Sequence, residues 1–424
     1  MKLETHVVRF GWNNKNVLAW PFLFSLFSLL NLNTGARAEE VITSSLSSPT
    51  QTISQQSEPS EFQVFAPVPF SSQDQPFQWG PVVARPHVSY QYLHGSGIQS
   101  TPTNQYTTDI HEVSPGITID LGTHWALDYT PTLRYYSDNH FKDEFNNAVS
   151  LTGNNAYQDW VFGLSQSYES SSSPLVETAT QTDREIFLTA LSASYAINEK
   201  MSLDMDLYQN LLFAANFQSF RDWSTMDWFN YQFWPRFNVG IGAGLGYVNV
   251  DAGPDQTYEH LSGRINWRAT DKLSFQVNAG FEERQFLGGG AGSLFNPTFG
   301  AAIQYQPFEA NRISLNANRS VSSSYFQDQV TENTSVSCNL NQRLLGKFYL
   351  DLSAGYGVTK YVGSTTSTTV DREDDSPNFS ARLSRSILKR GTVSVFYTYS
   401  KTSSTAPGYS FNSNQVGFSV RYSY

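Results

Sequence analysis

Apolar and polar residues alternate along most of this chain, from about residue 82 to the last position. In the segment 125–135 the odd positions read Trp, Leu, Tyr, Pro, Leu, Tyr, and the even positions read Ala, Asp, Thr, Thr, Arg. Successive side chains of a β-strand point to opposite faces, so this segment has one apolar and one polar face. The same period recurs in 273–281 and 348–356. The pattern predicts an all-β protein.

Segments of this kind are separated by turn residues throughout residues 82–424, and each is expected to form one strand. The eighteen predicted strands are 83–94, 107–121, 124–136, 145–153, 157–168, 184–196, 201–210, 221–233, 236–249, 257–268, 272–285, 295–306, 311–320, 330–343, 347–358, 376–387, 391–401 and 413–424.

The connectors between these segments alternate in length. Short connectors are predicted at 122–123, 153–156, 196–200, 234–235, 269–271, 306–310, 345–346 and 388–390. Longer connectors are predicted near 95–106, 169–183, 211–220, 286–294, 359–375 and 402–412. Short turns on one rim and long loops on the other are typical of a transmembrane antiparallel up-and-down β-barrel. We therefore expect about 18 strands, with 16 as the alternative, short periplasmic turns and longer extracellular loops.

The length of the apolar face favours a membrane barrel over a secreted sandwich. Phe237 and Tyr247 end the apolar face of one segment, ten residues apart, or about 33 Å along a strand. At a tilt of about 40° that distance covers a height of roughly 25 Å, the apolar band of such barrels. Aromatic residues also gather near the short turns, as at the lipid headgroup level. They are Trp125, Trp234, Phe237, Trp267, Tyr305 and Phe348.

The N-terminal 38 residues have the pattern of a secretory signal peptide. Three basic residues accompany an apolar run at 17–30, and Ala36-Arg37-Ala38 forms an A-x-A cleavage site before Glu39. A membrane-spanning helix is the alternative, but fourteen residues are short against the roughly 20 that a bilayer needs. Cleavage near Ala38-Glu39 would deliver the mature protein to the bacterial outer membrane.

Residues 39–80 differ in composition from the barrel segment 81–424. They are rich in Ser, Gln and Pro and are expected to form a disordered periplasmic tail. The tail is also long enough to enter the barrel as a partial plug, or to reach a periplasmic partner. Its aromatic residues are the expected anchors, namely Phe62, Phe65, Phe70, Phe77 and Trp79.

The C-terminus alternates to its last residue and carries a resemblance to a known family. Phe418, Val420, Tyr422 and Tyr424 occupy alternate positions, with Ser419, Arg421 and Ser423 between them. The chain resembles Gram-negative outer-membrane β-barrel proteins, most closely the putative β-barrel porin families, some of which are associated with exopolysaccharide export. The resemblance implies that these four residues are the barrel-insertion signal read by the outer-membrane insertion machinery. A terminal Phe is usual in those barrels, and Tyr424 departs from it.

Composition excludes several classes of function. Net charge is −10 and no basic block is present, so nucleic-acid binding has no support. Cys338 is the single cysteine, which excludes an internal disulfide. The seven histidines form no H-E-x-x-H pair, and no G-x-S-x-G elbow occurs. We therefore expect no catalytic, cofactor-binding or metal-binding residues. A hydrolase with a dyad formed across strands is a remaining alternative.

Two loop segments have unusual compositions. Residues 371–375 read DREDD and are expected in a long outer loop. Oxygen-rich loops can bind Ca²⁺, but the spacing matches no EF-hand, so a solvated loop is the favoured interpretation. Residues 288–290 are three glycines, which predict a flexible outer loop.

The polar residues at alternate positions of each strand are expected to face the lumen and to carry the function. Its charged candidates are Asp120, Asp128, Arg134, Asp204, Asp206, Arg264, Arg268, Glu282, Arg284, Asp351, Arg382 and Arg421. Six are acidic and six basic, which predicts weak charge selectivity and passage of neutral hydrophilic solutes, including carbohydrate or polysaccharide. Each charge could instead pair across the lumen and brace the wall. The alternative to a channel is a structural or adhesion barrel whose lumen is plugged and whose loops act.

Four glycines on alternate positions, Gly240, Gly242, Gly244 and Gly246, also fall on the lumenal parity. They do not form the G-x-G-x-x-G fingerprint of a dinucleotide site, and no helical pattern follows them. Glycine in a strand often marks the close approach of another group. Our hypothesis is that this stripe widens the pore or seats an inserted segment, with curvature of the strand as the alternative. Replacing Gly242 and Gly244 by Leu is then expected to lower conductance.

Overall fold

The computed structural model describes residues 77–288, 292–363 and 372–424. The predicted signal peptide, most of the predicted tail with Phe62, Phe65 and Phe70, and part of the triglycine segment lie outside the described residues. No helix among the described residues is long and apolar enough to cross a membrane.

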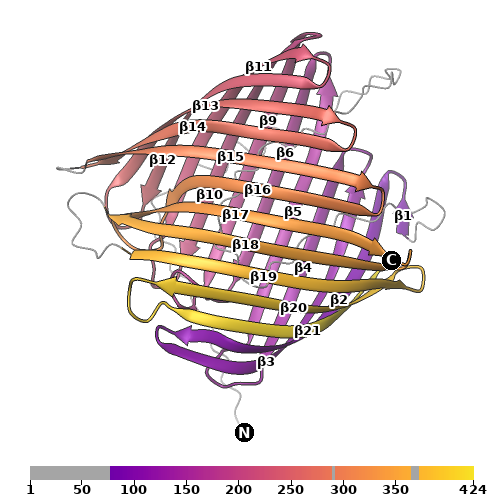
Figure 1. The fold of residues 1–424 in the computed structure, drawn as a ribbon, viewed down its shortest axis with the longest axis vertical. Coiled ribbons are helices and arrows are strands. Elements are labelled where there is room, and N and C mark those ends of the chain that lie inside the picture. The colour runs from indigo at the N-terminus through magenta and orange to yellow at the C-terminus, as the bar shows by residue number, and fades with distance from the viewer. Residues whose placement is uncertain (1–76, 289–291, 364–371) are drawn as a thin grey trace. The chain divides into compact units, whose positions relative to one another are not determined.

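Eighteen strands form a closed antiparallel barrel in which each strand pairs with its neighbours in the chain. The ring closes between the first and last of them, where His87 of β2 pairs with Ser423 of β21. In Figure 1 the yellow C-terminal strands accordingly lie beside the indigo N-terminal ones. The strands are β2 (Val82–Thr101), β3 (Asn104–Leu121), β4 (Trp125–Tyr136), β5 (Glu144–Tyr157), β6 (Trp160–Ser171), β9 (Arg184–Asn198), β10 (Met201–Ala214), β11 (Phe220–Trp234), β12 (Phe237–Val250), β13 (Asp255–Thr270), β14 (Leu273–Leu287), β15 (Ser293–Phe308), β16 (Asn311–Ser323), β17 (Gln329–Leu344), β18 (Phe348–Gly363), β19 (Arg372–Ile387), β20 (Gly391–Ser404) and β21 (Phe411–Ser423). The predicted fold of about 18 strands is confirmed.

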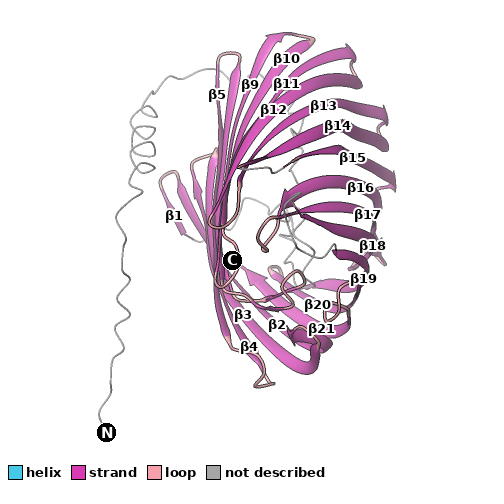
Figure 2. Cartoon of the chain, turned by 90° about the vertical axis from the view of Figure 1, so that its left-hand side faces the viewer, coloured by secondary structure: helices cyan, strands magenta, loops and turns pink. Residues whose placement is uncertain are grey.

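The alternation read from the sequence separates the two faces of the wall. Along β12, Ile241 and Leu245 are 61% and 64% exposed on the outside, whereas Gly242 and Gly244 between them are buried on the inside. Trp234 and Trp267 are exposed near the short turns, as expected for an interfacial girdle. Figure 2 shows strands on two facing walls with loop segments lying between them.

A short strand before the barrel extends the sheet at its seam. β1 (Phe77–Trp79) pairs with Val82–Ala84 of β2, and the ring of Phe77 lies 5.9 Å from that of Tyr424. The sheet therefore begins before the predicted barrel boundary at residue 81. Phe77 and Trp79 are exposed at this rim, and the expectation that the tail forms a plug stays a prediction.

Two predicted connectors consist mainly of strand residues in the structure. Gly153 lies opposite Trp125, whose ring covers the position of a Cβ there, and β5 continues to a turn at Gln158. Glycine and two asparagines had predicted a turn at 153–156, but cross-strand packing overrides their turn preference. Similarly, the predicted loop 95–106 is a hairpin that turns at Pro102-Thr103, with Thr103 in the left-handed region at φ 81°.

Candidate pore constriction

The longest connector between barrel strands that is fully described folds into the barrel. Residues 172–183 join β6 to β9 and contain the small hairpin of β7 (Pro174–Leu175) and β8 (Thr180–Gln181). The tip of this loop contacts the β16–β17 connector, which lies eight strands further round an eighteen-strand ring. Eight of eighteen is nearly half the circumference. The loop, called the constriction loop below, therefore crosses the lumen.

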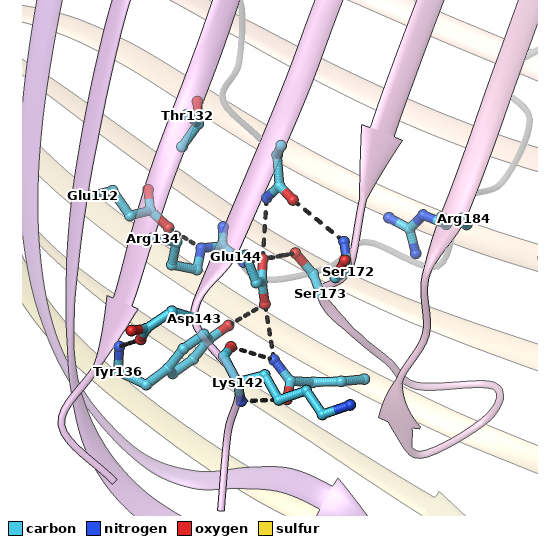
Figure 3. A network of polar contacts seen from close by, with 12 residues as sticks. Glu112, Thr132, Arg134, Tyr136, Lys142, Asp143, Glu144, Ser172, Ser173 and Arg184 are labelled. Atoms are coloured by element: carbon cyan, nitrogen blue, oxygen red, sulfur yellow. Dashed lines mark hydrogen bonds and ion pairs between the residues drawn. The ribbon is translucent and has the colours of Figure 1, made fainter. Parts of the chain in front are cut away.

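One end of the constriction loop, its root, is fixed by a buried charge network (Figure 3). The Arg134 Nε donates to Glu112 Oε1 at 2.5 Å, and its Nη1 donates to Ser173 Oγ of the loop at 2.6 Å. The same Nη1 lies 3.3 Å from Glu144 Oε2. Arg134 belongs to β4, Glu112 to β3 and Glu144 to β5, so three adjacent strands converge on the loop.

The carboxylate of Glu144 satisfies the remaining donors at the root. It accepts from Tyr136 Oη at 2.6 Å, from Ser173 Oγ at 3.0 Å and from Gln181 Nε2 at 3.1 Å. Ser173 and Gln181 come from opposite sides of the small hairpin, so both of its strands are tied to one carboxylate. Buried charges are stable only when paired and hydrogen-bonded, and Arg134 pairs with both Glu112 and Glu144, although the second carboxylate oxygen of Glu112 has no partner among the described residues.

The other end of the constriction loop, its tip, rests on the opposite wall. Glu177 Oε1 accepts from Ser324 Oγ at 2.6 Å and from the backbone N–H of Tyr325 at 2.8 Å. Burial raises the pKa of the Glu177 carboxyl above its ordinary value, with its two hydrogen bonds and Arg372 opposing the shift. The tip therefore carries a buried acid that is held by two donors.

Arg372 of β19 completes the contact between the tip and the wall. Its Nη1 donates to the Glu177 carbonyl oxygen at 2.9 Å, and its guanidinium forms a two-point pair with Asp374 at 2.9 and 2.5 Å. The rings of Tyr361 and Tyr409 lie 4.4 and 3.7 Å from its guanidinium carbon. Residues 371–375 were expected in a solvated outer loop; instead β19 begins at Arg372, and both charged side chains are buried in the lumen.

A further connector, residues 215–219 between β10 and β11, packs against the β16–β17 connector that holds the tip of the constriction loop. The backbone N–H of Gln218 donates to the Tyr325 carbonyl oxygen at 2.9 Å. The rings of Phe217 and Phe326 meet edge to face with centroids 5.9 Å apart. Tyr325 also packs against an apolar cluster on the lumenal side of β9–β13. The β16–β17 connector that receives the tip is therefore itself held by a neighbouring connector and by the wall.

Half of the twelve predicted lumenal charges take part in ion pairs among the described residues. Arg264 Nη2 lies 2.5 Å from Asp204 Oδ2, and Arg284 Nε lies 2.9 Å from Glu282 Oε1. Arg85, which was not predicted, pairs with Asp120 at 2.6 Å. The other predicted charges also occupy lumenal positions of their strands. Asp128 accepts from Thr118 and Thr130, and Asp351 of β18 lies opposite Arg382 of the adjacent strand β19. Asp206, Arg268 and Arg421 have no ion pair among the described residues.

The glycine stripe of β12 has a different role from the one expected. A Cβ on Gly242 would lie 2.6 Å from the ring of Trp228, and one on Gly246 would lie 2.1 Å from the ring of Tyr258. Trp228 belongs to β11 and Tyr258 to β13, so residues of the two flanking strands meet over the bare strand. The Tyr258 hydroxyl donates to Asp222 of β11 at 2.9 Å.

Arg264 makes the same bridge over Gly240, since it donates from β13 to Asn230 Oδ1 on β11 at 2.9 Å. Gly244 is likewise approached by Met226 of β11. The stripe thus seats side chains from its own neighbouring strands. Among the described residues, no segment from elsewhere in the chain lies against these glycines.

Sequence reasoning missed Glu112, Glu144, Glu177 and Arg372. Glu112 and Glu144 have the lumenal parity of their strands, so the same rule that found Arg134 could have found them. Glu177 carried no signal, because a polar loop of this composition is common on any surface. Among the described residues, no group of three or more His, Cys, Asp or Glu side chains is placed to hold a metal ion.

Comparisons with known proteins agree with this architecture. Residues 255–424 match the family described as "Putative beta-barrel porin 2". No curated protein matched the sequence.

Solved structures that are similar to the chain include two bacterial proteins at low identity. OccK2 (OpdF) of Pseudomonas aeruginosa, in complex with glucuronate, is 11% identical, with a TM-score of 0.45 and coverage of 80% of this chain and 98% of that one. OccAB3 of Acinetobacter baumannii is 9% identical, with a TM-score of 0.44 and coverage of 80% and 99%. The similarity is too low for a ligand or an activity of those proteins to be transferred.

The closed ring of eighteen strands, its apolar outer face with an aromatic girdle and the family match over residues 255–424 agree with one another. The chain is a closed eighteen-strand β-barrel protein whose residues 255–424 are similar to the family described as "Putative beta-barrel porin 2".

Proposed function

We propose that this barrel is a channel for small hydrophilic solutes with weak charge selectivity, and that the constriction loop limits its bore. The observation that carries the proposal is the pairing of lumenal charge. Five lumenal arginines, Arg85, Arg134, Arg264, Arg284 and Arg372, each have a carboxylate oxygen within 4.0 Å. Paired charges leave little net field along the path, so permeation depends mainly on size and hydrogen bonding.

Neutral carbohydrates are the solute class that this lumen suits best. Between the ion pairs, the lumenal positions of β16–β21 carry mostly Ser, Thr and Asn, which exchange hydrogen bonds with hydroxyl groups. An extended polysaccharide chain shares this chemistry, so its passage is a variant of the same proposal.

A barrel closed by its own loops is the second candidate, and the tip contact favours it. A constriction loop that is permanently held by Glu177 and Arg372 would leave a structural or adhesion protein whose exposed loops act. The two candidates differ in one measurable property, the conductance of the pore.

Planar-bilayer recording of the refolded barrel separates these candidates. We expect discrete conductance steps from the parent chain and larger steps from a Glu177→Ala/Arg372→Gln variant, in which the tip is released. Recording with and without residues 39–80 tests whether the tail also limits the current. Zero conductance from all of these chains would exclude the channel and leave the structural role.

A further inference from the structure

Asp206 of β10 is a lumenal carboxylate to which the described residues offer no partner. It lies on the same face of the strand as Asp204, and the residue is 8% exposed. No described residue forms a hydrogen bond or an ion pair with its side chain. Neither of its carboxylate oxygens is fully enclosed, so the group remains open to the lumen. A buried ionised carboxylate without a partner is costly, and this one therefore requires a proton or a cation.

The basic side chain of this patch, Arg264, is already paired with Asp204. Its Nη2 lies 2.5 Å from Asp204 Oδ2, and its Nε donates to Asn230 Oδ1 at 2.9 Å. Asp204 also accepts from Asn230 Nδ2 at 2.8 Å and from Ser194 Oγ at 2.7 Å. The acceptor oxygens of Asp204 are thus in use, whereas those of Asp206 are not. Two carboxylates beside one guanidinium leave the patch with one net negative charge.

The surroundings of Asp206 suit an organic cation better than a metal ion. Asp206 lies opposite Met226 of β11 and Ser192 of β9, and Tyr208 follows on the same face about 7 Å along β10. A hard metal ion takes about six oxygen ligands, and no group of three or more His, Cys, Asp or Glu among the described residues is placed to hold one. An ammonium group needs fewer acceptors and is attracted to the face of an aromatic ring.

The wall beside Asp206 leaves room for such a group. Ser192 lies opposite Gly163 of β6, and among the described residues a Cβ on that glycine would meet only Ser192 at less than 4.0 Å, apart from its chain neighbours. Ala190 and Ser194 flank Ser192 on the lumenal face of β9, so the side chains there are small. A solute can therefore approach Asp206 from β6 and β9 without displacing a large side chain.

We propose that Asp206 binds the protonated amine of a solute in the lumen, with the ring of Tyr208 as a second contact. The lumenal Ser, Thr and Asn side chains suit hydroxyl groups, so an amino sugar is the solute that combines both features. The sugar part of this inference rests on the proposed function. The amine site does not, because binding is measurable whether or not the lumen conducts.

Titration calorimetry on the refolded full chain in detergent, at pH 7 and low salt, tests the amine site. Glucosamine and N-acetylglucosamine share a sugar ring, but only glucosamine carries a positive charge. We expect glucosamine to bind about tenfold more tightly than N-acetylglucosamine. Ethylammonium carries the charge without the ring, and we expect it to bind more weakly than glucosamine.

A matched pair of variants locates the site. Asp206→Asn keeps the size of the side chain and removes its charge, and it should weaken glucosamine binding about tenfold, as expected for a hydrogen bond to a charged group. Asp128→Asn is the control, because Asp128 is a lumenal acid that already accepts from Thr118 and Thr130. Its replacement should leave the affinity unchanged. A heat-dependent shift in electrophoretic mobility confirms that each variant is folded.

Three results would overturn the amine site. The first is an affinity for glucosamine that Asp206→Asn leaves unchanged. The second is binding of Ca²⁺ that Asp206→Asn abolishes while glucosamine does not bind, which would make this a metal site. The third is no binding of glucosamine, ethylammonium or Ca²⁺, which would leave Asp206 with a proton alone. Equal affinities for ethylammonium and glucosamine would support the amine site and exclude the sugar contact. Zero conductance would count against the proposed function and would leave these affinities unchanged.

Discussion

The two ends of the constriction loop are held in different ways. At the root, Arg134 joins three adjacent strands, and Glu144 accepts from donors on both sides of the hairpin. At the tip, one carboxylate oxygen of Glu177 accepts two donors from another loop, and Arg372 adds bonds to backbone carbonyls. The root is thus hydrogen-bonded to strands of the barrel wall, whereas the tip is held by another loop and by Arg372 of the wall. A loop built in this way can release its tip without unfolding its root.

Breaking the root is expected to have the largest effect. Arg134→Met leaves Glu112 and Glu144 buried without a counter-charge, and it should lower the free energy of unfolding by about 3–5 kcal/mol. Urea unfolding of the refolded barrel measures this. Arg236→Met is the control, because Arg236 pairs with Asp271 at an exposed turn, and its loss should cost at most about 1 kcal/mol. Equal losses in both variants would show that the root is not a special anchor.

Breaking the tip should change conductance more than stability. Glu177→Ala leaves Ser324 Oγ and the Tyr325 N–H without their acceptor, at a cost of about 1–3 kcal/mol, while the pore widens. Single-channel recording should show larger steps with an unchanged barrel. Thr180→Ala is the control, since Thr180 lies in the same loop but, among the described residues, its hydroxyl hydrogen-bonds only to Thr182, at 3.4 Å. Parent-sized steps from the Glu177 variant would place the constriction elsewhere.

The tip should also respond to pH, with a smaller effect. Burial raises the pKa of Glu177 above its ordinary 4.5, so the closed tip binds a proton more tightly than a released, hydrated tip. Closure is therefore favoured as pH falls through the raised pKa toward 4.5, and this advantage is lost at higher pH. Among the nearby groups, Arg372 lowers this pKa and Asp374 raises it.

We expect the open fraction of the channel to decrease as pH falls toward 4.5. Current recordings over a pH series check this, and Glu177→Gln should flatten the profile. If the Gln variant keeps the parent profile, another group is responsible.

The smallest expected effect concerns the aromatic contact that covers the tip. Phe326→Leu removes the edge-to-face contact with Phe217, a change of about 0.5–1.5 kcal/mol, and should slightly raise the open fraction. Phe233→Leu removes a similar contact with Tyr231 on the outer face and should leave the open fraction unchanged. The pair thus compares an aromatic contact at the tip with one on the lipid-facing wall.

Most of the wall was predictable from the sequence because a barrel strand repeats every two residues. Each of the eighteen predicted segments overlaps one observed strand, and side-chain parity placed Arg134, Arg264 and Arg284 in the lumen. The errors arose where local preference and cross-strand packing disagree. Gly153 predicted a turn, but the Trp125 ring fills the space beside it and the strand continues.

The constriction was not predictable, because it depends on contacts between distant parts of the chain. Glu177 and Ser324 are far apart in sequence, and no local pattern links them. The run 371–375 was misread because five polar residues suggest a loop, although alternate members face the lumen and the outside. The bare strand at Gly240–Gly246 was recognised as unusual. Its occupants, Trp228 and Tyr258, follow only once β11 and β13 are known to flank it.

The seam between β2 and β21 has a consequence for the order of folding. Of the eighteen strand interfaces in the ring, seventeen join strands that are consecutive in the barrel, and only this one joins the two ends of the barrel chain. Seventeen interfaces can therefore form as local hairpins, whereas the last has the largest loop-closure entropy of any single interface. A chain that lacks β21 would keep every other pairing but expose two long strand edges, β2 and β20, to other chains.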